Sequence, residues 1–107
     1  QGLYPATQSS IGMVLLAAMA EQQVRELFAS RPIVGYEQID DLLRDLRLVR
    51  EDGYACVVQQ RRPRQASVAV PIGEPAYAAL ALTHDIRKRN LSHLLPAMKR
   101  TAAAIAG

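Results

Sequence analysis

Residues 67–83 read Ser-Val-Ala-Val-Pro-Ile-Gly-Glu-Pro-Ala-Tyr-Ala-Ala-Leu-Ala-Leu-Thr, and this stretch decides the fold. Two runs rich in apolar residues, 67–72 and 77–83, flank a Gly-Glu-Pro turn. This arrangement predicts two strands paired as an antiparallel hairpin. Because neighbouring residues of a strand point to opposite sides of a sheet, the two faces of the hairpin can be considered separately.

The two faces of this hairpin differ in side-chain size. The large face holds Val68, Val70, Ile72, Leu80 and Leu82. The small face holds Ser67, Ala69, Ala79, Ala81 and Thr83. Large side chains fill a core, whereas small ones either let a helix approach closely or leave a hollow, and a hollow edged with hydroxyls can hold a ligand. The hairpin therefore leaves two alternatives open, a packed face and a pocket.

The segment before the hairpin has a helical pattern. Ser9 and Ser10 precede the apolar run 11–20, and serine oxygens accept hydrogen bonds from the first amides of a helix. One face of this helix carries Ile11, Val14, Leu15 and Ala18. The opposite face is apolar as well, so we expect the helix to be buried.

Periodicity predicts three more helices and one more strand. The helices span 21–29, 38–52 and the segment from residue 91 onward, and the strand spans 54–58. Gly53 stands where a helix C-cap belongs. The inward stripes hold Val24, Leu27 and Phe28 in the second helix, Ile39, Leu42, Leu43, Leu46 and Val49 in the third, and Leu91, Leu94, Leu95, Met98, Ala102 and Ile105 in the last. Three helices, three strands and a closing helix predict an α+β fold.

Size and charge exclude several classes of protein. A chain of 107 residues fits one domain. The net charge of +3 is mild, and the densest basic cluster, Arg61, Arg62 and Arg64, surrounds a proline. That composition suits a solvated loop better than a helix that contacts DNA. The run 11–20 is about half as long as a membrane span, so no membrane contact is expected.

Catalytic and cofactor sites find little support in the sequence. His84 and His93 have no Cys or Asp at a triad spacing and no acidic or thiolate partner for a metal. No glycine-rich phosphate loop is present. Cys56 is the single cysteine, which excludes an internal disulfide, agrees with a reducing cytoplasm and, within a strand, suggests a small buried hydrophobe. We therefore expect that the chain is not an enzyme and that it binds no metal and no cofactor.

The start of the first helix is a better candidate site. A helix N-terminus presents unpaired amides and partial positive charge, which suit a carboxylate or a phosphate. The hydroxyls of Ser9 and Ser10 stand there as well, although serines that only cap a helix are common. A buried helix start that faces a sheet of small residues is thus a reasonable site for an acid.

Four motifs follow one another along the chain, and a closing helix with Leu94-Leu95-Pro96 comes after them. They are Thr7-Gln8-Ser9-Ser10-Ile11-Gly12 before Leu15-Leu16-Ala17, then Arg50-Glu51-Asp52-Gly53-Tyr54-Ala55, Ala66-Ser67-Val68-Ala69-Val70-Pro71-Ile72 and Ala78-Ala79-Leu80-Ala81-Leu82-Thr83. In order and spacing they resemble the second half or more of the effector-binding domain of the isocitrate-lyase-regulator (IclR) family of bacterial transcription factors.

The resemblance implies a GAF-like sensor domain, an antiparallel sheet with flanking helices that binds a small metabolite, often a carboxylic acid. Members of the family form homodimers or homotetramers and bind DNA through a separate N-terminal winged helix. Residues 1–107 contain no counterpart of that winged helix or of the first strands of the sensor domain. The resemblance therefore implies a single, partial effector-binding domain, with DNA bound only through the absent part.

Carried over position by position, the ligand contacts of the family fall on Ser10, Ile11, Val57, Ser67, Ala81 and Thr83. Ser9 joins them from the helix start. Where members of the family often carry an acid and a serine, this chain has Val57 and Ala81. We therefore expect a more apolar pocket, suited to an aromatic or other hydrophobic acid. The alternative is an oligomerisation domain whose small face is packed and holds no ligand.

Overall fold

The computed structural model describes residues 6–59, 65–73, 76, 78–85 and 91–107. In chain order its elements are the 3-10 helix η1 (Ala6–Gln8), α1 (Ser10–Ala17), α2 (Glu21–Leu27), α3 (Ile39–Asp52), β1 (Ala55–Gln59), β2 (Gln65–Ile72), β3 (Ala78–Asp85) and α4 (Leu91–Ala106). This order confirms the predicted α+β arrangement of helices, strands and a closing helix. The predicted arginine loop at 61–64 and the Glu74-Pro75 part of the turn lie outside the described residues.

The strands form an antiparallel sheet in the order β1-β2-β3. Residues that stand directly opposite each other share a face, so the register defines rows across the sheet. One row contains Ser67 between its partners on β1 and β3. The next row is made entirely of alanine, with Ala69 between Ala55 and Ala81. The predicted small face is therefore real and extends onto β1.

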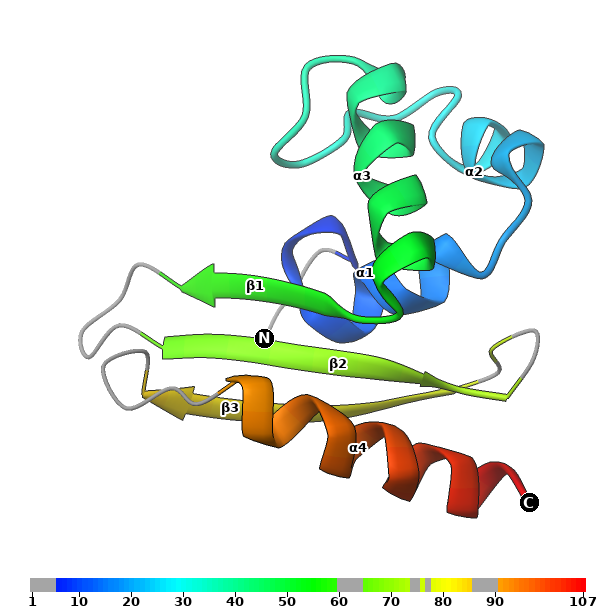
Figure 1. Cartoon of the computed structure of the whole chain (residues 1–107). Coiled ribbons are helices and arrows are strands. Elements are labelled where there is room, and N and C mark those ends of the chain that lie inside the picture. Colours follow the sequence, from blue (N-terminus) through cyan, green and yellow to red (C-terminus); the bar gives the residue numbers. More distant parts are fainter. Residues whose placement is uncertain (1–5, 60–64, 74–75, 77, 86–90) are drawn as a thin grey trace, which may run out of the picture.

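Helices cover both faces of the sheet, with α1 on one side and α4 on the other (Figure 1). The large face packs against α4 in a cluster that holds Val68, Val70, Ile72, Met98 and Ala102. The small face packs against α1 and, through it, against α2 and α3. The buried residues of this second cluster are Met13, Val14, Leu16, Ala17, Val24, Leu42, Leu43, Leu46, Ala55 and Ala69. The division of the hairpin into a large and a small face is confirmed.

The third helix follows its predicted pattern closely. Its stripe Leu42, Leu43 and Leu46 is at most 1% exposed. The helix ends at Gly53, whose φ of 79° lies in the left-handed region and whose N–H donates to the carbonyl of Val49 at 2.8 Å. A residue with a Cβ adopts that conformation only at a cost, so glycine at this position stops the helix.

Several side chains that were expected to be buried are exposed. The exposed side chains are those of Ile11 and Leu15 in α1, Leu27 in α2 and Ile105 in α4, at 37–55%. The buried side of the first helix holds Ser10, Met13, Val14, Leu16 and Ala17, so of the expected stripe Val14 is buried whereas Ile11 and Leu15 are not. Because this helix is apolar nearly all round, its pattern could not show which side faces inward.

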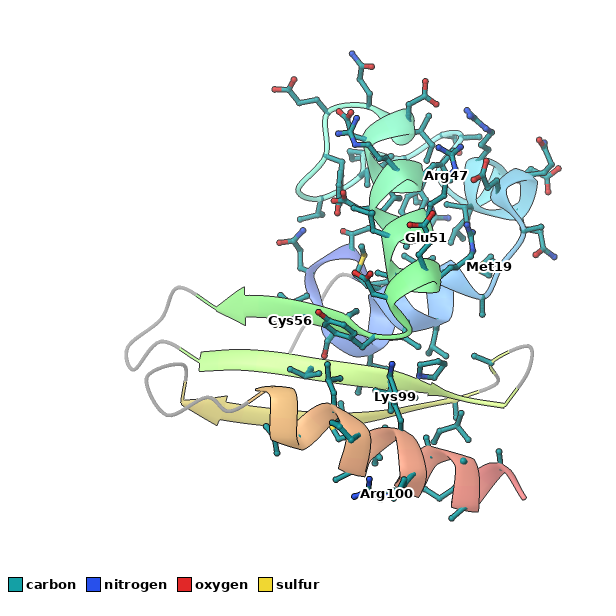
Figure 2. The ribbon with its side chains drawn as sticks, in the orientation of Figure 1. Met19, Arg47, Glu51, Cys56, Lys99 and Arg100 are labelled. Carbon is teal, nitrogen blue, oxygen red and sulfur yellow. The ribbon has the colours of Figure 1, made fainter. Side chains whose placement is uncertain are left out.

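Two predictions near the sheet also need correction. Cys56 is exposed, because it stands opposite Val68 at the edge of the sheet, away from α1 (Figure 2). The last strand was expected to end at Thr83, but β3 extends to Asp85 and includes His84. Within the described residues, no helix combines the length and the apolar character needed to cross a membrane.

Candidate functional site

The start of α1 has the geometry of a capped helix. Ser9 is the N-cap in an extended conformation, and its Oγ accepts a hydrogen bond from the amide of Gly12 at 2.9 Å. Its carbonyl accepts from the amide of Met13 at 3.0 Å. The amides of Ser10 and Ile11 belong to the first turn, where the helix itself offers no carbonyl four residues earlier to accept from them. Two donors at the positive end of the helix dipole thus remain for another acceptor.

Ser10 and Ser67 meet across the interface between helix and sheet. Their hydroxyl oxygens lie 2.6 Å apart, although 57 positions separate the two residues in the chain. Ser10 is only 1% exposed, which makes it one of the most buried polar residues of the described chain. The hydroxyls satisfy each other in an otherwise apolar contact, as buried polar groups must.

The segment before α1 is held firmly in place. The Thr7 hydroxyl, which is buried, donates to the carbonyl of Val34 at 2.6 Å. A Cβ at Gly12 would overlap the backbone of Ala6, so glycine is required where η1 folds back onto the helix. The turn before α3 therefore helps to fix the direction of the first helix.

The remaining predicted contacts occupy different positions relative to the serine pair. Val57 and Thr83 flank Ser67 in its row of the sheet, and the side chain of Thr83 is outside the described residues. Ala81 stands in the neighbouring alanine row and is partly buried. Ile11 is 43% exposed, so its side chain points away from the sheet. The structure thus brings Ser10, Ser67 and Val57 together and leaves the Ile11 side chain outside the group.

Described residues line at least three cavities, of which one lies at the opposite end of α1 from these serines and one lies against α4. One of about 280 Å³ lies beside Ala17, Arg50 and Pro71, and one of about 300 Å³ lies between α4 and the end of β2. The third, of about 220 Å³, lies between η1, α1, α3 and β1 and includes Val57 in its wall. Ser9, Ser10 and Ser67 line none of these three.

Two cations secure the ends of the helices near the first two cavities. Arg50 belongs to α3, and its Nε donates to the Ala17 carbonyl at 2.6 Å, at the end of α1. Figure 2 shows Lys99 reaching from α4 toward the end of α3, where its Nζ donates to the carbonyl of Asp52 at 3.3 Å. Both cations stabilise the negative ends of helix dipoles. They thus have a structural role in these contacts.

A polar pair at the third cavity was not predicted. The phenol of Tyr36 donates to Asp45 Oδ2 at 2.7 Å. Partial burial, reinforced by the neighbouring carboxylate, raises the pKa of Tyr36 above its ordinary value. Tyr36 lies in the turn before α3, where no periodic pattern exists, and Asp45 belongs to the polar face of that helix. No sequence signal connects the two residues.

No family profile matches the sequence, and no curated protein matches it either. Solved structures do match. An IclR homolog from Microbacterium sp. strain HM58-2 superposes with a TM-score of 0.79 over 99% of the chain at 23% identity. The chain has the fold of an IclR-type regulatory domain. The likeness to this family stated from the sequence is thus confirmed for the fold.

Two other regulators have a similar structure. The repressor BlcR of Agrobacterium tumefaciens gives a TM-score of 0.78 over 96% of the chain at 22% identity. A double mutant of the inducer-binding domain of PobR from Acinetobacter, in complex with 3-hydroxy benzoic acid, gives 0.78 over 96% at 19% identity. The chain spans 47% of the Microbacterium homolog, 46% of BlcR and 68% of the PobR domain. It thus spans about half of the Microbacterium homolog and of BlcR, and about two thirds of the PobR domain.

Proposed function

We propose that this chain is the effector-sensing part of an IclR-type transcriptional regulator and that it binds a small carboxylic acid at the start of α1. The observation that carries this proposal is the hydrogen-bonded pair of hydroxyls, the buried Ser10 and the half-buried Ser67, beside two helix amides that have no acceptor in their own helix. Hydroxyl and amide donors that converge at a helix N-terminus suit a carboxylate. The bound hydroxybenzoic acid of the PobR domain supports an acid as the ligand class.

The residues around the serines favour a hydrophobic acid. Val57 stands beside Ser67 in one direction, and the alanine row adjoins it in the other. In this proposal Ser9 holds the helix start, Ser10, Ser67 and Thr83 supply hydroxyls, and Ile11 contributes its amide. Val57 and Ala81 form apolar walls. A ring or an alkyl chain would replace water against these walls at a gain in free energy.

The whole protein would act on DNA through a winged-helix domain that lies outside this chain. Effector binding would shift the equilibrium between arrangements of a homodimer or homotetramer and so change the spacing of the DNA-binding domains. The chain itself would use no catalytic group, metal or cofactor. These statements about the whole regulator rest on the likeness of the fold.

An oligomerisation domain without a ligand is the second candidate. The observation that favours it is the tight contact of α1 with the alanine row, where Ala69 has no exposed surface. In that case the small residues serve close packing alone, and no carboxylic acid stabilises the protein.

A thermal-shift experiment separates the two candidates. Benzoate, 3-hydroxybenzoate and octanoate are compared with acetate and glyoxylate. A ligand at a hundred times its Kd stabilises the folded state by about 2.7 kcal/mol, which raises Tm by several degrees. The proposal expects such a rise with the hydrophobic acids and its loss in Ser10→Ala. In the matched control Ser30→Ala, an exposed hydroxyl outside the proposed site is removed, so the shift persists. If no acid raises the Tm of the wild-type protein, the sensing function is wrong.

A further inference from the structure

The cavity between η1, α1, α3 and β1 is large enough for a small ring. Its volume is about 220 Å³, and it is open to solvent beside the exposed Leu48 and Cys56. An engineered protein cavity of about 150 Å³ with apolar walls binds benzene. All the residues that line this cavity are among the described ones, and most of them are apolar, including Met13, Leu48, Val49 and Ala55. Burial of a ring against such walls is favourable.

The Asp45 carboxylate in this cavity can accept further hydrogen bonds. The Asp45 carboxylate is half-buried and lines the cavity. The described residues provide it with one hydrogen-bond donor, the phenol of Tyr36. An ionised carboxylate has about four acceptor positions, so Asp45 can accept from a ligand without losing Tyr36. The other hydroxyl in the wall, that of Thr7, already donates to the carbonyl of Val34.

The chemistry of the walls selects among ligands. A neutral hydroxyl can donate to Asp45, and its loss of hydration costs little free energy. An ammonium could donate as well, but the mostly apolar walls make its desolvation costly. A carboxylate would be repelled by the charge of Asp45. The cavity therefore favours neutral compounds with a hydroxyl, whereas the serine pair favours carboxylates.

We propose that this cavity binds a small phenol, with the ring against Met13 and Val49 and the hydroxyl donating to Asp45. The site is separate from the proposed acid site, and Val57 is the predicted contact that the two share. It does not depend on whether the chain senses an acid. A regulator with both sites would respond to a neutral aromatic compound and to an acid independently.

Phenol itself is the probe, and the methionine methyl groups report its position. The chain has three methionines. Met13 lines the cavity, whereas Met19 and Met98 do not line it and serve as internal controls. In the full protein labelled with 13C at the methionine methyl groups, we expect phenol to shift the Met13 signal in a saturable manner. Toluene, which has the same size but no hydroxyl, should bind about tenfold more weakly.

The variant Asp45→Asn tests the acceptor. Asparagine keeps the shape and one acceptor oxygen, so the contact with Tyr36 and the fold should persist. We expect phenol to bind about tenfold more weakly, because a hydrogen bond to a charged acceptor is replaced by one to a neutral acceptor. The matched control is Asp41→Asn, on the first turn of the same helix and outside the lining of the cavity, which should bind phenol as the wild type does.

The outcomes decide the proposal without reference to the acid site. The proposal is overturned if phenol leaves the Met13 signal unchanged or if it shifts all three methionine signals alike. It is also overturned if Asp45→Asn binds phenol with unchanged affinity. If Ser10→Ala loses acid binding but still binds phenol, the phenol site stands. If the protein binds acids but not phenol, the phenol site is rejected and the acid site is unaffected.

Discussion

Removal of one hydroxyl from the Ser10–Ser67 pair should cost more than its size suggests. In Ser67→Ala, the Ser10 hydroxyl loses its partner at 2.6 Å while it stays buried at 1% exposure. A buried polar group without a partner costs about 1–3 kcal/mol. For a domain near this size, each kcal/mol corresponds to a Tm change of about 4–8 °C. We therefore expect Ser67→Ala to lower Tm by at least about 4 °C.

A double-mutant cycle isolates the hydrogen bond itself. Ser10→Ala should also destabilise the protein, since it leaves the half-buried Ser67 hydroxyl without its partner in the helix. The double variant removes both hydroxyls and leaves neither unsatisfied, so its cost should fall well below the sum of the two single costs. We expect a coupling free energy of about 1 kcal/mol or more, measured by urea unfolding followed by circular dichroism.

The neighbouring serine provides the control for this cycle. Ser9→Ala removes the helix cap and should cost about 1 kcal/mol. Its oxygen contacts the amide of Gly12 and not the sheet, so its cost should add to that of Ser67→Ala. Additive costs for Ser10→Ala and Ser67→Ala, within about 0.5 kcal/mol, would refute the role given to this pair.

Three further predictions concern the surroundings of the site. Gly12→Ala should cost about 1–3 kcal/mol in urea unfolding, because its Cβ would overlap the backbone of Ala6. Gly53→Ala should cost about 1 kcal/mol because of its positive φ, and Gly53→Asn should cost less. The hydrogen bond from Arg47 holds the pKa of Glu21 below its ordinary value of 4.5. Its stabilisation is therefore present above pH 4.5 and lost as the pH falls further, so the Tm difference between the wild type and Glu21→Gln should shrink below that pH.

The sheet was predictable from the sequence because the pattern of side-chain sizes is compatible with only one assignment of the two faces. In residues 67–83, large and small side chains alternate with a period of two, and a strand that slipped by one residue would exchange the two faces. The structure shows the expected result, with Val68 and Ala69 fully buried on opposite sides. The third helix was equally clear, because its leucine stripe and the glycine after it agree on its bounds.

The direction of α1 was not predictable in the same way. Apolar residues surround this helix, so hydrophobicity favours no side. The small Ser10 and Ala17 are buried together with larger residues such as Met13, whereas Ile11 and Leu15 remain exposed. A polar residue at the most buried position of an apolar helix is an outcome that a hydrophobic pattern cannot predict.

The candidate site was predictable only in part for a related reason. The small face and the helix start could be derived from local patterns, which placed Ser10 and Ser67 on surfaces that could meet. The walls of the phenol cavity come from four separate elements, and the contact of Thr7 with Val34 joins positions 27 apart. Contacts of this kind depend on the angle between helices, about which no stretch of the sequence carries a signal.

The serine pair also constrains how an acid could act as a signal. In the structure each hydroxyl is the partner of the other, so a carboxylate that takes both must replace their hydrogen bond. A carboxylate has two oxygens and can accept from both hydroxyls, whereas a ligand with one acceptor would leave a buried hydroxyl unsatisfied.

Seating such a group between a helix and a strand requires them to separate. The alanine row under the rest of α1 is already in close contact, so the least costly movement is a tilt of the helix start about Ala69. A helix that has two such positions is the kind of element through which a ligand can change the arrangement of a larger assembly. An acid that left α1 in place would depend on the amides of Ser10 and Ile11 alone, and for such a ligand Ser67→Ala would not alter the affinity.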